Sequence, residues 1–360
     1  MKKHSVLVAM SGGIDSNVAA YILKKNNYKV KGVYFQLTEE KNPQKYAHNS
    51  EKIDFSSFQK VKMAAKKIGI PLTFIDYRQP FKEIIETHFM NEYLKGRTPN
   101  PCILCNRAIK FHLLLRFAKT NHIDYIATGH YINIEWNEKK GEYFLKRGWD
   151  LRKDQSYFLY ELGQNVLSRC IFPLGKMSKK EVREIANKAG LAGMNGKESQ
   201  EICFIPDNDY RKLILEYQPE KIKTGFFKDI SGNILGQHKG IAFYTIGQRR
   251  KIGLSLNTRK YIVRINPEKN TIIIGDEKDL YQNEFWIEKL HFINNESPKQ
   301  TFKAEVQIRY NSAPATAKLI PFAHEKCKVI FEKPQRAVTP GQSAVFYQKD
   351  RVLGGGIICN

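Results

Sequence analysis

The sequence predicts an α/β domain with a parallel sheet, followed by a small β-rich domain and a C-terminal β-barrel. Up to about residue 206, apolar strand-like segments alternate with helix-like ones, which is typical of parallel sheets covered by helices. After residue 206 the chain changes to short alternating segments separated by turns, which is typical of small all-β units. We therefore expect domains at residues 1–206, 207–279 and 280–360.

The first domain divides into strands and helices by pattern. We expect strands at residues 4–10, 29–35, 71–76 and 124–128, and helices near 15–25, 55–68, 80–95 and 105–121. Residues 39–54 are polar and patternless, so they predict a mobile loop. Ser178 and Glu181 form a capping-box pattern that begins another helix, and Gly190 ends it. In such folds ligands bind at the carboxyl ends of the strands.

The charge of the chain favours a polyanionic partner. The 360 residues include 59 Lys and Arg against 36 Asp and Glu, a formal charge of +23. This excess attracts nucleic acid, although a lysine-rich solvated surface would have the same charge. No stretch approaches the ~20 apolar residues of a membrane helix, and the first apolar run is too short for a signal peptide. We expect a cytoplasmic protein without a membrane segment.

The stretch SGGIDS, residues 11–16, follows the first predicted strand and opens the first helix. Gly12 and Gly13 let the backbone approach an anion closely. The N-terminus of the helix adds the positive end of the helix dipole, and Ser11 and Ser16 add hydroxyl groups. An ordinary tight turn would also contain these glycines. Because the stretch lacks the lysine of the common nucleotide loop, it suits a pyrophosphate held as a leaving group.

This stretch resembles the Ser-Gly-Gly-x-Asp-Ser signature of the PP-loop ATP pyrophosphatase superfamily. Its members cleave ATP between the α and β phosphates and adenylate a substrate oxygen. The stretches that resemble one branch, the tRNA-specific 2-thiouridylases, are GRTPNPCILCN (96–106), ATGHY (127–131), KDQSYFLY (153–160), ESQEICFIP (198–206) and YTIGQRRKIGL (244–254). The likeness to this branch extends from residue 6 to the C-terminal glycines and implies ATP-dependent 2-thiolation of the wobble uridine of tRNA.

The resemblance implies an ATP site with Mg²⁺ that arrives with the nucleotide, and no metal site made of protein side chains alone. Phe35 stands where the family often has a methionine against adenine, but packing in the core would explain it equally well. The ATP contacts that the resemblance implies are Ala9, Met10, Ser11, Gly12, Gly13, Ile14, Asp15, Ser16, Phe35 and Gly129.

Two cysteines fit the chemistry that the resemblance implies. The C2 oxygen of uracil becomes a leaving group once it is adenylated, and a persulfide is a suitable sulfur nucleophile near neutral pH. By resemblance Cys203 is the persulfide carrier. Cys105 is the partner nucleophile that attacks the outer sulfur, and the two cysteines can end disulfide-linked. Direct attack of the persulfide on the base remains an open alternative.

The other cysteines have less certain meaning. Cys102 stands where many relatives have an aspartate that acts as general acid or base, and a thiol with a pKa near ~8.5 against ~3.9 puts that role in doubt. Cys102 and Cys105 also have the spacing of a thioredoxin-like pair or of half a zinc site, although no second pair exists. Cys170, Cys327 and Cys359 lie in apolar stretches, which indicates buried structural thiols.

The resemblance also implies tRNA contacts and a persulfide donor protein as a partner. The anticodon loop is a suitable target, because an unstacked base can be splayed into a pocket. Each contact residue, taken alone, could instead have a purely structural role, and for His130 the two roles are equally expected. The contacts are Asn100, Pro101, Cys102, His130, Lys153, Asp154, Gln155, Arg309, Tyr310 and Gln342.

Two other functions compete with thiolation. A ligase that transfers nitrogen could use the same ATP site, but it would have no use for two distant thiols. An RNA-binding protein without activity would have no use for an intact SGGIDS stretch.

Overall fold

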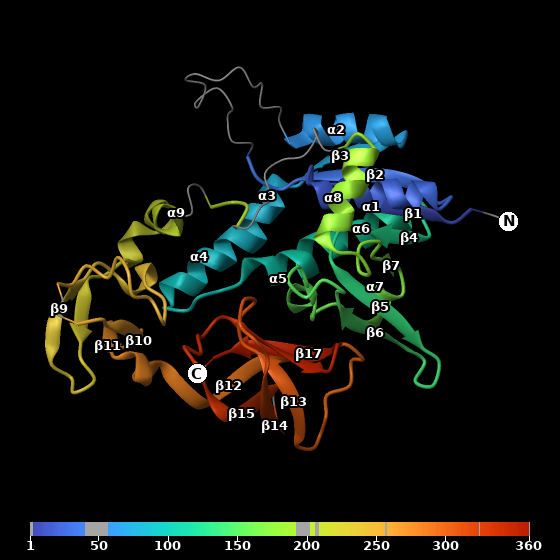
Figure 1. Ribbon diagram of the computed structural model, residues 1–360. Coiled ribbons are helices and arrows are strands. Elements are labelled where there is room, and N and C mark those ends of the chain that lie inside the picture. Colours follow the sequence, from blue (N-terminus) through green and yellow to red (C-terminus); the bar gives the residue numbers. More distant parts are fainter. Residues whose placement is uncertain are drawn as a thin grey trace. The chain divides into compact units, whose positions relative to one another are not determined.

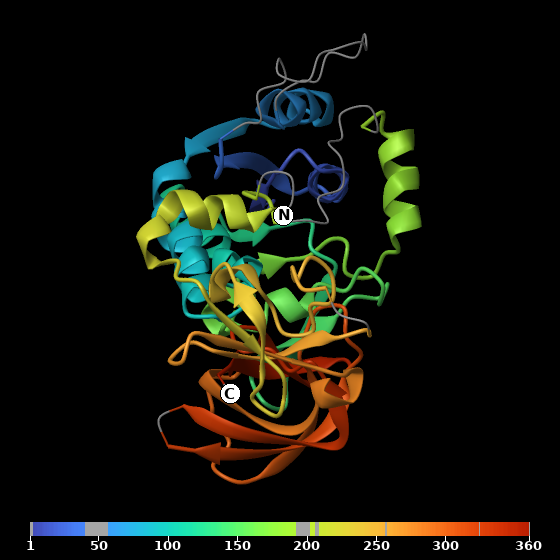
Figure 2. The same ribbon diagram turned by 90° about the vertical axis from the view of Figure 1, so that its left-hand side faces the viewer.

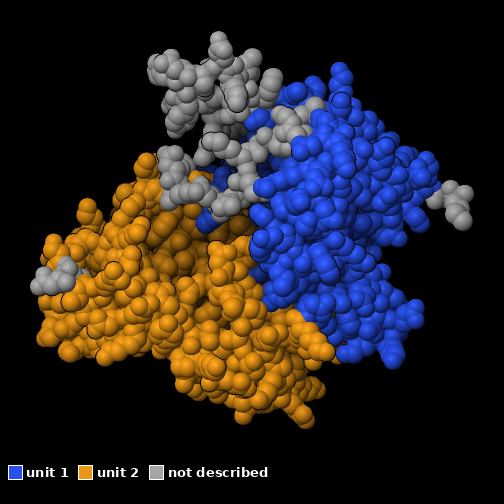
Figure 3. Space-filling view, viewed as in Figure 1, with its two compact units in different colours: residues 1–84, 104–203, 350–352 blue, residues 85–103, 204–349, 353–360 orange. Residues whose placement is uncertain are grey.

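The computed structural model describes residues 3–39, 57–191, 202–205, 209–255, 258–323 and 325–359. The chain forms two compact units made of interleaved segments (Figure 3). The predicted loop at 39–54 lies outside the described residues apart from its first residue, and the boundaries near 206 and 280 stay a prediction. Unit 1 contains residues 1–84, 104–203 and 350–352, and unit 2 contains 85–103, 204–349 and 353–360.

Unit 1 is built on a parallel five-stranded sheet of order β3-β2-β1-β4-β7 (Figure 1). The chain runs outward from β1 to β3 and then returns to β4 on the other side of β1. This reversal is the position at which open α/β sheets bind their ligands. All four predicted strands are confirmed. The strands are β1 (Ser5–Ala9), β2 (Lys29–Gln36), β3 (Leu72–Asp76), β4 (Tyr125–Ala127) and β7 (Cys170–Ile171).

Three helices share one apolar core with the sheet: α1 (Ile14–Lys25), α2 (Ser57–Ile68) and α8 (Lys179–Lys188). The predicted capping box begins α8, since Ser178 Oγ accepts a hydrogen bond from the Glu181 amide and the Glu181 carboxylate accepts one from the Ser178 amide at 2.7 Å. After this helix the chain reverses at Gly190, which has a φ of +67°. The predicted helices at 15–25 and 178–189 are therefore confirmed, and most of the one at 55–68.

The remaining predicted helices are each divided. The one at 80–95 is α3 (Arg78–Phe81), a π-helical turn (Lys82–Glu86) and α4 (Thr87–Leu94), and the one at 105–121 is α5 (Pro101–Cys105), a second π-helical turn (Asn106–Phe111) and α6 (His112–Thr120). A hairpin that the sequence did not predict follows β4. It consists of β5 (Ile132–Asn137) and β6 (Glu142–Arg147), and after it come η4 (Ser156–Phe158) and α7 (Gln164–Leu167).

Unit 2 contains a small mixed sheet and a closed barrel. The small sheet has the order β10-β11-β8-β9. Its strands are β8 (Gly225–Lys228), β9 (Ile234–His238), β10 (Tyr261–Asn266) and β11 (Thr271–Gly275), with α9 (Tyr210–Tyr217) and the short helices η7 (Pro219–Lys221), η8 (Ile241–Phe243) and η9 (Glu277–Leu280) around it.

The six C-terminal strands form an antiparallel barrel of order β12-β15-β14-β13-β16-β17, which closes where β12 pairs with β17 (Figure 2). Its interior is filled by buried side chains that include Phe285, Leu319, Val329 and Phe346. The predicted barrel is therefore confirmed. The strands are β12 (Tyr281–Phe292), β13 (Phe302–Gln307), β14 (Ala315–Phe322), β15 (Lys326–Arg336), β16 (Ser343–Gln348) and β17 (Arg351–Ile358).

No helix in the described part of the chain combines the length and the apolar character that a bilayer crossing needs.

Candidate functional site

The glycine turn lies between the carboxyl end of β1 and the start of α1. Gly12 has a φ of +81°, a conformation that favours glycine. The Ser11 amide donates to Ser16 Oγ at 3.1 Å, and that hydroxyl donates to the Gly13 carbonyl at 3.0 Å. Ser16 is thus buried inside the turn and braces it. The first amides of α1 have no acceptor within the helix, which makes this end of the helix suitable for an anion.

Gly129 lies directly against this turn. A Cβ atom at Gly129 would come within 2.7 Å of the Asp15 carbonyl carbon and the Ser16 amide nitrogen. Only glycine, which has no Cβ, therefore fits at position 129. The ends of β1 and β4 therefore meet at the reversal of the sheet, as their order predicts, and they bring Gly129 together with residues 11–16.

A buried lysine pairs with Asp15. Lys179 Nζ lies 2.7 and 2.8 Å from the two carboxylate oxygens of Asp15, and the hydroxyl of Tyr131 donates to the same carboxylate at 2.7 Å. The Lys179 side chain is only 7% exposed. A buried ammonium group is costly without a paired anion. Lys179 therefore neutralises the carboxylate of Asp15 at the start of α1.

Sequence reasoning missed Lys179 because 164 positions separate it from Asp15. One local signal existed. Lys179 is the first residue of α8, where the positive end of the helix dipole disfavours a cation. A lysine at that position needs an anionic partner from elsewhere in the fold, but the sequence does not identify which one.

The other predicted ATP contacts lie on β1, β2 and the turn. Met10 is buried at the end of β1. Phe35 is half-buried near the end of β2, beside Ile75 of β3. Its neighbour Tyr34 belongs to the core beneath α1 and α2, so by strand alternation Phe35 faces the opposite side of the sheet. Its contact with adenine stays a prediction.

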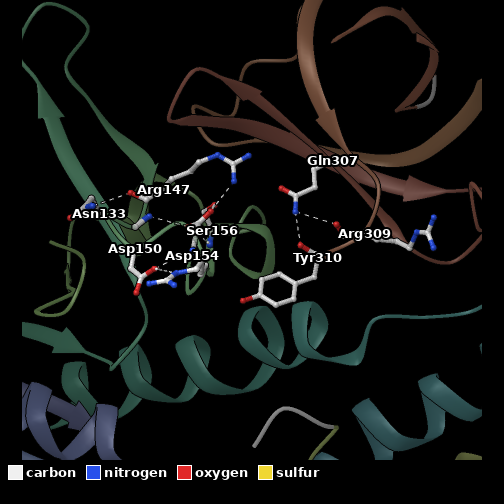
Figure 4. A network of polar contacts seen from close by, with 10 residues as sticks. Asn133, Arg147, Asp150, Asp154, Ser156, Gln307, Arg309 and Tyr310 are labelled. Carbon is white, nitrogen blue, oxygen red and sulfur yellow. Dashed lines mark hydrogen bonds and ion pairs between the residues drawn. The ribbon is translucent and has the colours of Figure 1, made fainter. Parts of the chain in front are cut away.

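Asp154, a predicted tRNA contact, lies inside the protein. Its carboxylate accepts hydrogen bonds from Arg147 Nη1 at 2.9 Å, the Gly148 amide at 3.0 Å, the Ser156 amide at 3.1 Å and Ser156 Oγ at 2.8 Å (Figure 4). Asp154 is 6% exposed. The carboxylate therefore organises the turn between β6 and η4, and sequence reasoning missed Arg147 as its partner.

The neighbours of Asp154 are more accessible. Lys153 and Gln155 are half-buried. Gln155 exchanges two hydrogen bonds with Tyr131, whose amide donates to Gln155 Oε1 and whose carbonyl accepts from the Gln155 amide. Since the Tyr131 hydroxyl binds Asp15, the predicted tRNA-contacting segment is joined to the glycine turn by one residue.

His130 is held as a neutral imidazole. Its Nδ1 lies 2.7 Å from Thr128 Oγ1, and its ring stacks on Phe111 with 6.0 Å between the ring centroids. Burial, helped by the nearby Lys110 charge, lowers the pKa of His130 to about 3. In the protein without ligand, His130 is therefore uncharged near pH 7.

The predicted catalytic cysteines differ in accessibility. Cys105, at the end of α5, is buried with 5% exposure, and Cys203 is exposed; both belong to unit 1. Cys102 is half-buried in the first turn of α5, where its amide donates to Asn100 Oδ1 at 3.1 Å. No cluster of three His, Cys, Asp or Glu side chains suitable for a metal ion occurs among the described residues.

Two of the three structural thiols are buried as predicted. Burial raises the pKa of the Cys170 thiol, and it raises that of Cys327 to about 11. The prediction for Cys359 was wrong, because this residue is only half-buried. It follows the end of β17 and lines an open apolar pocket beside Trp286 and Phe322.

In unit 2, two of the predicted tRNA contacts, Gln342 and Arg309, bind the protein's own backbone through their side chains. Gln342 Nε2 donates to the Thr98 carbonyl at 2.7 Å, and the Arg309 guanidinium donates to the Arg336 carbonyl. The Tyr310 carbonyl accepts from the Gln307 side chain at 2.7 Å (Figure 4). Thr98 belongs to the same segment as Asn100 and Pro101, so Gln342 anchors that segment to the barrel.

Three family models match consecutive parts of the chain and together cover most of it. Residues 4–207 match the "tRNA methyl transferase HUP domain", 211–276 the "tRNA methyl transferase PRC-barrel domain" and 282–358 the "Aminomethyltransferase beta-barrel domain". A solved 4-thiouridine synthetase–RNA complex with bound ATP is 20% identical with a TM-score of 0.37, and the match covers 61% of this chain and 50% of that one.

Two curated relatives are much more similar, and both are named "tRNA-specific 2-thiouridylase MnmA". The one from Carboxydothermus hydrogenoformans is 44% identical over 99% of this chain and 98% of its own. The one from Acetivibrio thermocellus is 43% identical over 99% of this chain and 100% of its own. With this identity over the full length, the chain belongs to the MnmA family of tRNA-specific 2-thiouridylases.

Proposed function

We propose that this protein replaces the C2 oxygen of the wobble uridine of tRNA with sulfur, at the expense of ATP. The observation that carries the proposal is the full-length similarity to chains named 2-thiouridylases, joined in unit 1 with a braced glycine turn and the two candidate cysteines. ATP and tRNA both occur in the cytoplasm, where we expect the protein to act.

In the first step, the uracil C2 oxygen attacks the α-phosphate of ATP, the α–β anhydride bond breaks, and pyrophosphate leaves. The backbone of residues 9–16 and Gly129 would hold the nucleotide. Asp15 stands beside the phosphates in this arrangement, and its own charge would repel them. Its pairing with Lys179 and Tyr131 at 2.7 Å cancels that repulsion and fixes the carboxylate.

Mg²⁺ fits this site as a companion of the nucleotide. The carboxylate of Asp15 is already paired with Lys179, so oxygen atoms of phosphate and water, which suit Mg²⁺, would supply its ligands. When bound, the ion would neutralise charge on the departing pyrophosphate.

In the second step, sulfur from Cys203 replaces the adenylated oxygen and AMP leaves. The exposure of Cys203 suits the receipt of sulfur from a persulfide donor protein. For a Cys105–Cys203 disulfide to form, the Cys105 thiolate must attack the sulfur bonded to Cβ of Cys203, so that the outer sulfur leaves as hydrosulfide or as the thiolated base. Attack on the outer sulfur, which the sequence suggested, would leave no such disulfide. An external thiol reductant then restores both cysteines.

We propose that the tRNA anticodon loop contacts both units. In unit 1 the accessible parts of the predicted set are His130, Lys153 and Gln155, and Asp154 shapes their turn. In unit 2, Asn100, Pro101 and Cys102 would border the target base on a segment that Gln342 anchors, with Arg309 and Tyr310 on the barrel. Cys102, a thiol in place of an acid, would be a weaker proton donor or acceptor.

The test supplies ATP, unmodified tRNA and a persulfide donor, and measures thiouridine and AMP. Wild-type protein should form both products, and Cys203→Ser should form no thiouridine while it retains tRNA affinity. Cys359→Ser, a half-buried thiol of unit 2, is the matched control and should stay active. AMP without thiouridine would favour a ligase, and neither product would favour an RNA-binding protein. Full activity in Cys203→Ser would remove this cysteine from the reaction.

A further inference from the structure

The turn between β6 and η4 carries two large apolar side chains that point into solvent. Trp149 is 75% exposed and Leu151 is 70% exposed. Arg152 lies beside them with its side chain 92% exposed, and Lys153 follows. Among the exposed large apolar side chains of the described residues, these two have the highest exposure, and they lie next to two cations.

The turn that carries Trp149 is held from several sides. The Trp149 amide donates to the Gly175 carbonyl at 2.9 Å, and the Lys153 amide donates to the Asp150 carbonyl at 2.8 Å. The Asp150 carboxylate accepts from the Arg152 amide at 3.2 Å and from the Lys179 amide at 3.3 Å. The backbone is therefore fixed, and the exposure of Trp149 is a feature of a rigid turn.

Trp149 differs from the other two tryptophans of the chain. Trp136 pairs with the Tyr143 ring at 4.8 Å, and Trp286 pairs with the Phe322 ring at 4.9 Å. Trp149 has no ring partner within the described residues. A fixed, open indole beside cations is how proteins bind unstacked bases of single-stranded nucleic acid.

We propose that Trp149 and Leu151 form a stacking platform for an unpaired nucleobase of the tRNA, with Arg152 and Lys153 on the adjoining phosphates. This inference rests on the proposed function and adds a contact to it. The net charge of +23 and the neighbouring Lys153 and Gln155 favour RNA over a protein partner for this face.

The test compares tRNA affinity of Trp149→Ala, Trp149→Phe and wild type at one salt concentration. We expect roughly tenfold weaker binding for Trp149→Ala, near-normal binding for Trp149→Phe, and quenching of Trp149 fluorescence by tRNA. Trp136→Ala, an exposed tryptophan of the same unit, is the matched control and should bind normally. ATP affinity without tRNA should be the same in all four proteins.

Two results would overturn this inference. The first is an equal tRNA affinity of Trp149→Ala and wild type, in an experiment in which the wild type binds tRNA. The second is a loss of self-association in that variant, which would make the face a protein contact. A wild-type protein that neither binds nor thiolates tRNA would instead refute the proposed function.

A second inference comes from a different set of contacts. Asp15 in the glycine turn is bound by Lys179 and Tyr131, and each of these also binds the turn that precedes η4: Lys179 through its amide to Asp150, and Tyr131 through its backbone to Gln155. We infer that Lys179 and Tyr131 are positioning residues that couple tRNA binding at this turn to ATP binding at the glycine turn.

The coupling is measured as the ratio of ATP-analogue affinities with and without saturating tRNA, with an analogue that cannot be cleaved between the α and β phosphates. We expect tRNA to tighten the binding about fivefold or more in wild type, and this ratio to be smaller in Tyr131→Phe, which removes the hydroxyl and leaves the link through Lys179. Tyr143→Phe, on the neighbouring hairpin, should keep the wild-type ratio. A ratio of one in a wild type that binds both ligands, or an unchanged ratio in Tyr131→Phe, would overturn the inference.

Discussion

The pairing of Lys179 with Asp15 leads to a quantitative prediction. Lys179→Met keeps the length of the side chain and removes its charge, while the Tyr131 hydroxyl still donates a hydrogen bond to the Asp15 carboxylate at 2.7 Å. Breaking one side of a buried ion pair costs about 3–5 kcal/mol. Because Asp15 is 30% exposed, water can solvate the unpaired carboxylate and offset part of this cost. We expect the free energy of unfolding of Lys179→Met to be lower by about 2–4 kcal/mol.

The opposite substitution should cost at least as much. Asp15→Asn leaves the ammonium group of Lys179, which is 7% exposed against 30% for Asp15, without its counter-ion. The double variant Asp15→Asn, Lys179→Met removes both charges and should lose less than the sum of the single variants. The expected coupling energy of this double-mutant cycle is about 2–4 kcal/mol at pH 7.

Native-state hydrogen exchange measures this coupling locally. The opening free energies of amides in α1 and α8 should follow the cycle, and those of amides in β13 and β16 of the barrel should remain unchanged. A coupling energy below about 0.5 kcal/mol, the scatter of independent sites, would refute the reasoning. It would mean that solvent screens the pair in spite of its short distances.

Three further outcomes follow from the geometry. Gly129→Ala places a Cβ 2.7 Å from backbone atoms of residues 15 and 16, so calorimetry should detect little ATP binding, and denaturation should detect about 1–3 kcal/mol lower stability. The pKa of His130 near 3 lies below its ordinary ~6.5, so between these two pH values the unfolded state binds one proton more than the folded state. The free energy of unfolding should therefore be highest above pH ~6.5 and fall by up to about 1.4 kcal/mol per pH unit toward pH 3. Denaturation at a series of pH values should show this slope in wild type and not in His130→Asn. Native alkylation followed by mass spectrometry should modify the exposed Cys203 before Cys170, whose thiol is buried with a raised pKa; equal rates would contradict this order.

Local patterns predicted most of the fold. The alternation of β1, α1, β2, α2 and β3 and the Ser178–Glu181 capping box depend on neighbouring residues, and the structure contains them. The β5–β6 hairpin was missed, although its strands pair regularly from the pair Ile132–Arg147 to the pair Asn137–Glu142. The sequence of β5, INIEWN, alternates strictly between apolar and polar residues and could have been predicted as a strand, whereas β6, EYFLKR, does not alternate.

The site was predicted less completely, because its contacts are distant in sequence. A glycine turn after a strand can be read locally, and so can Gly129 at the end of another strand. The partners of Asp15 and Asp154 cannot, since Lys179 and Arg147 come to them only through tertiary structure. Asp154 illustrates the difference: its polar neighbours suggested a surface that meets RNA, whereas its carboxylate holds four donors inside the turn.

The interleaving of the two units has a consequence for any attempt to dissect the protein. Residues 85–103 lie between two segments of unit 1 along the chain, yet they pack within unit 2, where Arg97 pairs with Glu288 at 3.0 Å and the Thr98 amide donates to the Pro340 carbonyl at 2.8 Å. A fragment that ends near residue 206 would therefore contain residues 85–103 without the hydrogen-bond acceptors that they have in unit 2. Residues 1–206 therefore contain a segment of unit 2, and no single cut in the chain separates the two units.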